Sequence, residues 1–222
     1  MTSKFLIRAL GMSAVLTAAA SATPAMAQGN TRVLQVPCCR CLDGNKQTVS
    51  INTGTAGWVV ARPNTTAFSA VIPASNTAWA TSLAPAAWVG PAGAPTTLGD
   101  YTYQIAFNVP RCTIPGGVSI SGRFLADNGA KVYLDGATTP VASSLGTPTY
   151  GFHPGSVTPF TITGIAPGNH ILRVVVNNSS SVTALALQGA ITVACPNNLT
   201  AALAPATVVA GGPAQPCGCV AS

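Results

Sequence analysis

The stretch from Gly122 to Gly136, which reads GRFLADNGAKVYLDG, limits the possible folds of this chain more than any other segment. An apolar run ends before Asp127-Asn128-Gly129, three residues that tolerate left-handed backbone. Val132 and Leu134 then alternate with polar neighbours, and Asp135-Gly136 supplies a second turn. This pattern predicts a β-hairpin with short strands and tight polar turns.

Strict alternation of apolar and polar residues recurs along the chain. In Tyr101 to Val109 the odd positions are apolar or aromatic, and Val118 to Phe124 repeats the pattern. Further strands are expected at Thr48 to Asn52, Trp58 to Ala61, Phe160 to Ile165, Ile171 to Asn177 and Thr183 to Val193. There is no helical stripe, and 18 Pro and 22 Gly punctuate the chain. We therefore predict an all-β fold of seven to nine antiparallel strands in a two-sheet β-sandwich. Residues 63–95 are expected to form a surface excursion or weak edge strands.

Three segments resemble the galactose-binding-like jelly roll, a carbohydrate-binding β-sandwich found beside glycosidase barrels and in free binding modules. They are Tyr101 to Pro110 (YTYQIAFNVP), the Gly122 to Gly136 stretch, and Pro167 to Asn178 (PGNHILRVVVNN). The resemblance implies a jelly-roll sandwich and a carbohydrate partner. A fold does not determine an activity, so the ligand needs separate support.

The N-terminus has the composition of an export signal. Lys4 and Arg8 precede an apolar run, and Ala25-Met26-Ala27 fits the small-x-small cleavage rule. The alternative is a retained membrane anchor, but the apolar core is shorter than the roughly 20 residues that span a bilayer. We predict a signal peptide over 1–27, a Cys-rich segment over 28–47, a sandwich domain over 48–195 and a Pro/Ala/Gly-rich tail over 196–222. The mature protein is then secreted, extracellular or periplasmic, with no integral membrane segment after cleavage.

All seven cysteines follow the signal, and export favours disulfides. Cys112 and Cys195 each follow an expected strand, so we predict a bridge between them. The terminal cysteines, Cys38, Cys39, Cys41, Cys217 and Cys219, have no assigned pairing. The odd count leaves one thiol free or available for covalent self-association.

Cofactor chemistry finds little support in the sequence. Cys38-x-x-Cys41 and Cys217-x-Cys219 could offer four thiolates, but the second spacing is shorter than zinc sites favour. Resembling modules often bind calcium, yet four Asp, mostly in tight turns, offer few hard ligands. We predict no cofactor, with calcium as the alternative. The basic residues are scattered without a stripe, which argues against a nucleic-acid partner.

Catalysis finds as little support as cofactor binding. Glycoside hydrolysis needs two carboxyl groups about 5 to 10 Å apart, and Asp127 and Asp135 stand at opposite ends of one expected strand. His153 and His170 could serve a hydrolase, but there is no Gly-x-Ser-x-Gly elbow. We therefore predict that the chain is not an enzyme.

Candidate sugar contacts are aromatic and polar residues expected at loops: Trp79, Trp88, Asp127, Asn128, Tyr150 and His153. Each has a structural alternative. Trp58 and Trp88 suit a core and a sheet edge, and Asp127 and Asn128 suit backbone capping of a turn. Trp79 lies in the irregular region, where packing explains it least.

The sequence thus predicts a secreted, non-catalytic module that binds carbohydrate through aromatic and polar loop residues. The rival is a disulfide-linked structural or surface-interaction protein of an envelope or extracellular matrix. The cysteines favour the rival, and the resemblance favours sugar binding.

Overall fold

The computed structural model describes residues 33–37, 46–55, 57–80, 83–93, 95–111, 113, 116–144 and 151–194. The predicted signal peptide, all seven cysteines, Tyr150 and the C-terminal tail lie outside these residues. Within them, the only helical element is a 3₁₀ turn at Pro154–Ser156. No helix among the described residues is long and apolar enough to cross a membrane.

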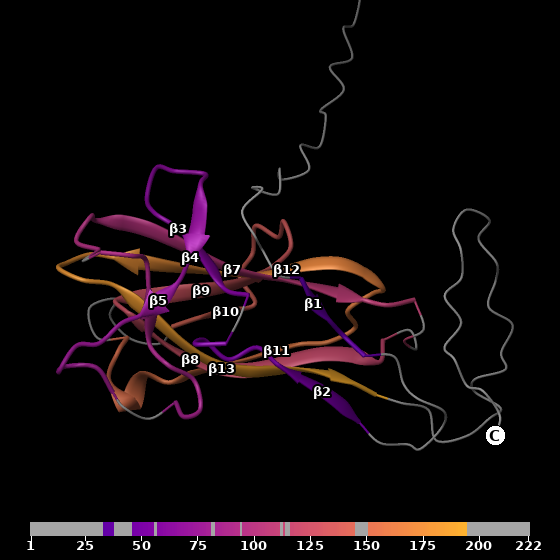
Figure 1. The fold of residues 1–222 in the computed structure, drawn as a ribbon. Coiled ribbons are helices and arrows are strands. Elements are labelled where there is room, and N and C mark those ends of the chain that lie inside the picture. Colours follow the sequence, from indigo (N-terminus) through magenta and orange to yellow (C-terminus); the bar gives the residue numbers. More distant parts are fainter. Residues whose placement is uncertain are drawn as a thin grey trace, which may run out of the picture.

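Two sheets face each other across one core (Figure 1). The seven-stranded sheet has the order β10-β9-β12-β7-β3-β4, and β1 pairs with β7 in parallel. Its strands are β1 (Leu34–Gln35), β3 (Val59–Ala61), β4 (Phe68–Ala70), β7 (Gly99–Val109), β9 (Gly129–Leu134), β10 (Ala142–Ser143) and β12 (Gly168–Asn178). All its other pairings are antiparallel.

The six-stranded sheet has the order β11-β8-β13-β6-β5, and β2 pairs with β13. Its strands are β2 (Gln47–Ser50), β5 (Ile72–Pro73), β6 (Val89–Gly90), β8 (Val118–Asp127), β11 (Thr158–Ile162) and β13 (Ala184–Val193). The predicted all-β, two-sheet antiparallel sandwich is confirmed. The strands outnumber the expected seven to nine because several pieces of only two or three residues join the sheet edges.

Alternation decides which side chains fill the space between the sheets. Tyr101, Tyr103, Ile105, Phe107 and Val109 point inward from β7 and are buried, as predicted. Trp58 is also in the core, as expected, and its Nε1 donates to the Ile51 carbonyl oxygen at 2.9 Å. Each such side chain contributes about 1.5 to 3 kcal/mol of hydrophobic stabilisation, so the interior faces fix both sheets.

The predicted hairpin at Gly122 to Gly136 is wrong in its pairing. β8 and β9 are strands, but β8 pairs with β11 and β13, whereas β9 pairs with β12 and β10. The chain therefore crosses from one sheet to the other at Asp127-Asn128. The second turn is present, and Asp135 has a φ of 53°.

The region 63–95 combines both expected alternatives. β4 and β5 lie at the edges of the two sheets. Between them and β6, the chain covers the outer face of the six-stranded sheet, where Ala80 and Leu83 pack on Leu125 and Ala186. Trp88 packs against the same small cluster, so it covers a sheet face rather than a sheet edge.

Candidate functional site

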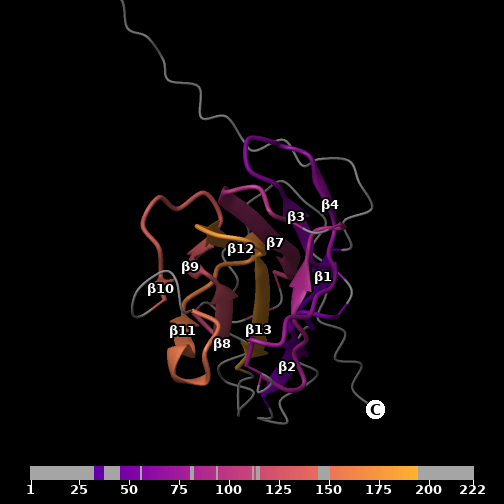
Figure 2. The same ribbon diagram turned by 90° about the vertical axis from the view of Figure 1, so that its left-hand side faces the viewer.

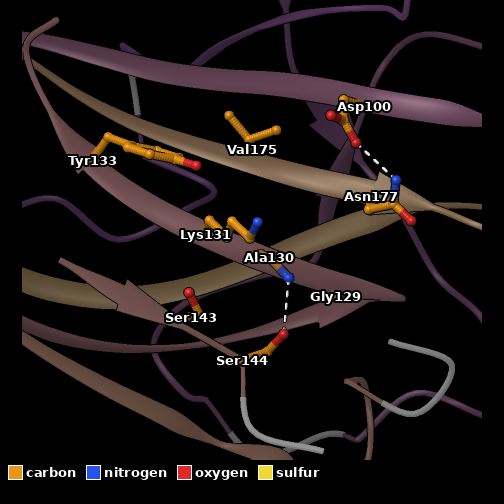
Figure 3. A pocket seen from close by; sticks show the side chains of 9 residues that line it. All are labelled: Asp100, Gly129, Ala130, Lys131, Tyr133, Ser143, Ser144, Val175 and Asn177. Atoms are coloured by element: carbon orange, nitrogen blue, oxygen red, sulfur yellow. Dashed lines mark hydrogen bonds between the residues drawn. The ribbon is translucent and has the colours of Figure 1, made fainter. Parts of the chain in front are cut away.

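A groove of about 390 Å³ opens on the outer face of the seven-stranded sheet, where β9, β10 and β12 lie together (Figure 3). In Figure 2 these strands lie on the side of the molecule away from β3 and β4. Gly129, Ala130, Val175 and the side chains of Asp100, Lys131, Tyr133, Ser143, Ser144 and Asn177 line it.

The alternation that builds the core also builds this groove. Val132, Val174 and Val176 are fully buried, so the residues between them on β9 and β12 face outward. Register then brings distant residues side by side, because Val175 pairs with Lys131 and Asn177 pairs with Asp100. The groove therefore combines residues that are far apart in the sequence.

One end of the groove carries a carboxylate and an amide. The Asn177 Nδ2 donates to Asp100 Oδ1 at 2.7 Å, and both residues are exposed. This bond leaves the second Asp100 oxygen and the Asn177 amide oxygen as acceptors for a ligand. Figure 3 shows this pair at the opposite end of the groove from Tyr133.

Lys131, Ser143 and Ser144 supply hydrogen-bond donors between the two ends. Ser144 Oγ accepts from the Ala130 backbone N–H at 3.0 Å, which leaves its hydroxyl hydrogen free to donate. Lys131 is exposed and brings an ammonium group with three donors. A ligand with several hydroxyl groups could therefore both donate and accept here.

Tyr133 gives the groove an aromatic wall. The Arg173 guanidinium carbon lies 4.7 Å from the centre of the Tyr133 ring, and Arg173 Nη2 donates to the Ala137 carbonyl oxygen at 3.1 Å. Stacking by a cation on one ring face is worth about 0.5 to 1 kcal/mol at an exposed site. Arg173 thus restricts the orientation of the ring.

The sequence-predicted residues gather elsewhere, around the point where β8 ends. Trp79 and Trp88 stack with ring centroids 4.7 Å apart, and Trp79 Nε1 donates to Asp127 Oδ2 at 2.7 Å. Trp79 is 8% exposed and Asp127 is 6% exposed. The expectation that packing explains Trp79 least is therefore wrong, because the indole is held by both a stack and a hydrogen bond.

Burial also changes the protonation of this cluster. Desolvation raises the pKa of the Asp127 carboxyl, and the hydrogen bond from Trp79 opposes that rise in pKa. The neighbouring Trp88 Nε1 donates to the Ala80 carbonyl oxygen at 2.8 Å. The polar atoms of the indoles are thus satisfied within the protein.

Asn128 is 2% exposed and links this corner to the groove. Its Oδ1 accepts from the backbone N–H of Ser179 at 2.8 Å, and its own backbone N–H donates to the Asn177 carbonyl oxygen at 3.0 Å. Asn128 therefore holds the backbone of a groove residue. The His153 ring packs on the Phe152 ring, with the ring centroids 4.6 Å apart, next to the 3₁₀ turn. A ligand-binding role for the six predicted residues stays a prediction.

Lys131, Tyr133, Asp100 and Asn177 were not among the predicted contacts. A signal existed for two of them, since Lys131 and Tyr133 alternate with the inward Val132 and Leu134. Asp100 and Asn177 could not be found in this way, because their proximity depends on the pairing of β7 with β12.

The described residues hold no group of three or more His, Cys, Asp or Glu side chains that could bind a metal ion. Asp100 is the one carboxylate among the residues that line the groove. The predicted disulfides and the thiolate metal site lie outside the described part of the chain, and calcium binding stays a prediction.

Fold and groove together define an antiparallel β-sandwich with a polar, aromatic-walled site on one sheet face. No protein-family model and no curated protein matches the chain. Among solved structures, it is similar to a family 35 carbohydrate-binding module from Clostridium thermocellum (TM-score 0.39, 11% identity, 65% of this chain and 97% of the other). It is also similar to a xylan-binding module of family CBM15 (TM-score 0.38, 8% identity, 69% of this chain and 100% of the other).

A third similar structure is a GH2 β-galacturonidase from Eisenbergiella tayi bound to galacturonate (TM-score 0.35, 20% identity). This match covers 64% of the chain but only 24% of the enzyme. The sandwich is consistent with the galactose-binding-like jelly roll that the sequence resembles. With TM-scores below 0.5, these likenesses carry no argument about a ligand.

Proposed function

We propose that this chain is an exported, non-catalytic module that binds a carbohydrate in the groove on the seven-stranded sheet. The observation that supports the proposal most strongly is the composition of the groove, where the Tyr133 ring lies at the opposite end from the Asp100–Asn177 pair (Figure 3). Binding sites typically join an apolar surface with a few polar groups that fix orientation.

The groove suits the chemistry of a sugar. A pyranose has an apolar C–H face that can pack on the Tyr133 ring, and its hydroxyl groups both donate and accept hydrogen bonds. Asp100 and Asn177 offer acceptors, and Lys131 and Ser144 offer donors. The single carboxylate of the groove fits binding without hydrolysis, which requires two.

The test is binding of the purified exported protein to a panel of neutral soluble glycans, with and without calcium. Tyr133→Ala should weaken binding about tenfold or more, because it removes the apolar ring surface that the sugar would bury, at about 25 cal/mol per Å². Tyr133→Phe keeps the ring and should retain most of the affinity. Normal binding by Tyr133→Ala would overturn this site.

Trp79→Phe tests the predicted loop site separately. This variant keeps an aromatic ring on Trp88 but loses the hydrogen bond to Asp127, whereas Trp79→Ala would remove a buried indole at a cost of about 3 to 5 kcal/mol. The sugar binds around Trp79, Trp88 and Asp127 instead if Trp79→Phe remains folded but loses binding, while Tyr133→Ala still binds normally.

The rival function is a covalently assembled structural protein, favoured by the seven cysteines of the sequence. Non-reducing electrophoresis of the exported protein separates the two. A ladder that collapses on reduction supports covalent assembly, and a clean monomer removes the main reason for proposing it.

A further inference from the structure

Part of the outer face of the six-stranded sheet is a surface of small side chains, most of which carry a hydroxyl group. Strand register aligns them in two rows across the sheet. One row runs Thr161, Ser121, Ala190 and Ser50, and the other runs Ser119, Thr192 and Thr48. The inward neighbours Ile120, Ile191 and Val193 are fully buried, so these hydroxyl-bearing residues belong to the outer face. In these two rows the side chains are short, so this part of the face is flat and exposes hydroxyl groups.

Taller residues border part of this surface, and together with Thr48, Ser50, Ser121 and Ala190 they line a trough of about 530 Å³. Arg123 stands between Pro159 and Gln188 in the next row of the sheet. Arg123 Nε donates to Gln188 Oε1 at 2.7 Å, and Gln188 Nε2 donates to the Ala84 carbonyl oxygen at 3.1 Å. The guanidinium is thus fixed at the edge of the trough by a neutral partner.

Arg123 is the one charged side chain among the residues that line the trough, and no carboxylate lines it. The bond to Gln188 uses Nε, and the Nη groups have no hydrogen-bond partner among the described residues. Two terminal N–H groups of a guanidinium form a planar fork that matches a carboxylate. The trough therefore presents one unneutralised cation beside a floor of hydroxyl groups.

We propose that this trough is a second binding site, which takes a carboxylate-bearing polysaccharide. The sugar carboxylate lies on the Nη groups of Arg123, and neighbouring sugar hydroxyls bond to Ser121, Ser50 and Thr48. The floor spans four strands, or roughly 14 Å at about 4.8 Å between strands, which accommodates a short stretch of an extended chain. The site lies on the opposite face of the sandwich from the groove and does not depend on it.

Other macromolecules fit this face less well. A peptide anchor needs an apolar pocket for its side chains. The described residues that line the trough are mainly small, and Pro85 and Pro159 are the only larger apolar side chains among them. A nucleic acid needs several cations and aromatic side chains on which bases stack, whereas no aromatic side chain lines the trough. A chain of hydroxylated, carboxylated rings matches both the single cation and the hydroxyl floor.

The test measures binding of polygalacturonate fragments to the purified exported protein by calorimetry. Arg123→Gln should weaken binding about tenfold, because a charge-assisted hydrogen bond is lost. Ser121→Leu, which fills the trough floor, should weaken it to a similar degree. The matched control Arg62→Gln removes the same charge from an exposed arginine outside the trough and should change the affinity less than twofold.

Tyr133→Ala should leave polygalacturonate binding unchanged, so failure of the proposed neutral-sugar site and failure of this site are distinguishable. Three results would overturn the inference. The first is no saturable binding of polygalacturonate. The second is equal weakening by Arg123→Gln and Arg62→Gln. The third is equally tight binding of polyglutamate, dextran sulfate or single-stranded DNA, which would show a general response to negative charge.

Discussion

The carboxyl group of Asp127 is buried beside the stacked indole rings of Trp79 and Trp88, at the point where the chain crosses from one sheet to the other. Its Oδ2 accepts from Trp79, and its backbone oxygen accepts from the Thr183 hydroxyl. Burial raises its pKa in the folded state. The folded state therefore holds this proton more tightly than the unfolded chain does, so the contribution of Asp127 to stability is lost as the pH rises through the folded pKa.

We expect Asp127→Asn to change the pH dependence of unfolding in one direction. The amide keeps an acceptor for Trp79 but does not ionise. The free energy of unfolding of the variant, minus that of the native protein, should grow as the pH rises above about 4, the unfolded pKa of Asp, and should level off above the raised folded pKa. Urea unfolding at several pH values measures it. A difference that shrinks over this range would contradict the assigned burial effect.

At the scale of elements, Thr53 joins β13 to the segment that covers the outer face of the six-stranded sheet. Its Oγ1 donates to the Ala87 carbonyl oxygen at 2.5 Å and accepts from the Leu187 backbone N–H at 3.0 Å. The residue is buried. One hydroxyl thus satisfies groups on two elements that are far apart in the sequence.

Thr53→Val has nearly the same shape and should cost about 2 kcal/mol, because it leaves a buried donor and acceptor without their partner. Thermal and urea unfolding measure this loss. Thr55→Val is the matched control, since Thr55 is exposed and bonds only within its own turn. It should change stability by about 0.5 kcal/mol or less. A similar small effect at Thr53 would show that its two bonds do not join the elements.

The strands were predictable from the sequence because alternation is a local signal. The pairing of β8 with β9 was predicted wrongly for the same reason. A polar turn between two alternating runs has the same appearance whether the runs pair with each other or enter opposite sheets. The outcome depends on β13 and β12, which follow much later and pair with β8 and β9 respectively.

At the scale of the molecule, the candidate site follows from topology more than from composition. Tryptophans are the obvious aromatic candidates in the sequence, yet the structure buries Trp58 and Trp79. Tyr133 and Lys131 face outward by alternation, but they become a groove only when β12 brings Asn177 beside Asp100. The sequence predicts which residues face outward from each strand. It does not predict which strands pair, and that long-range pairing is what assembles the groove.

The sandwich presents its two candidate sites on opposite outer faces. The groove lies over β9 and β12, and the trough lies over β8 and β13. These strands belong to different layers, as Figure 1 shows. A ligand in one site would therefore leave the other accessible, so the two proposed ligands, a neutral and a carboxylated chain, would not compete.

The most direct test of the central claim is an NMR titration of the nitrogen-labelled exported protein with the neutral glycan that binds most tightly in the panel. We expect the backbone amide shifts to change at Ala130, Lys131, Tyr133, Ser144 and Asn177, around the groove. Amides of the trough strands β2 and β11 serve as the internal reference and should not move. Changes confined to Trp79, Trp88 and His153, or no saturable change, would contradict binding at the groove.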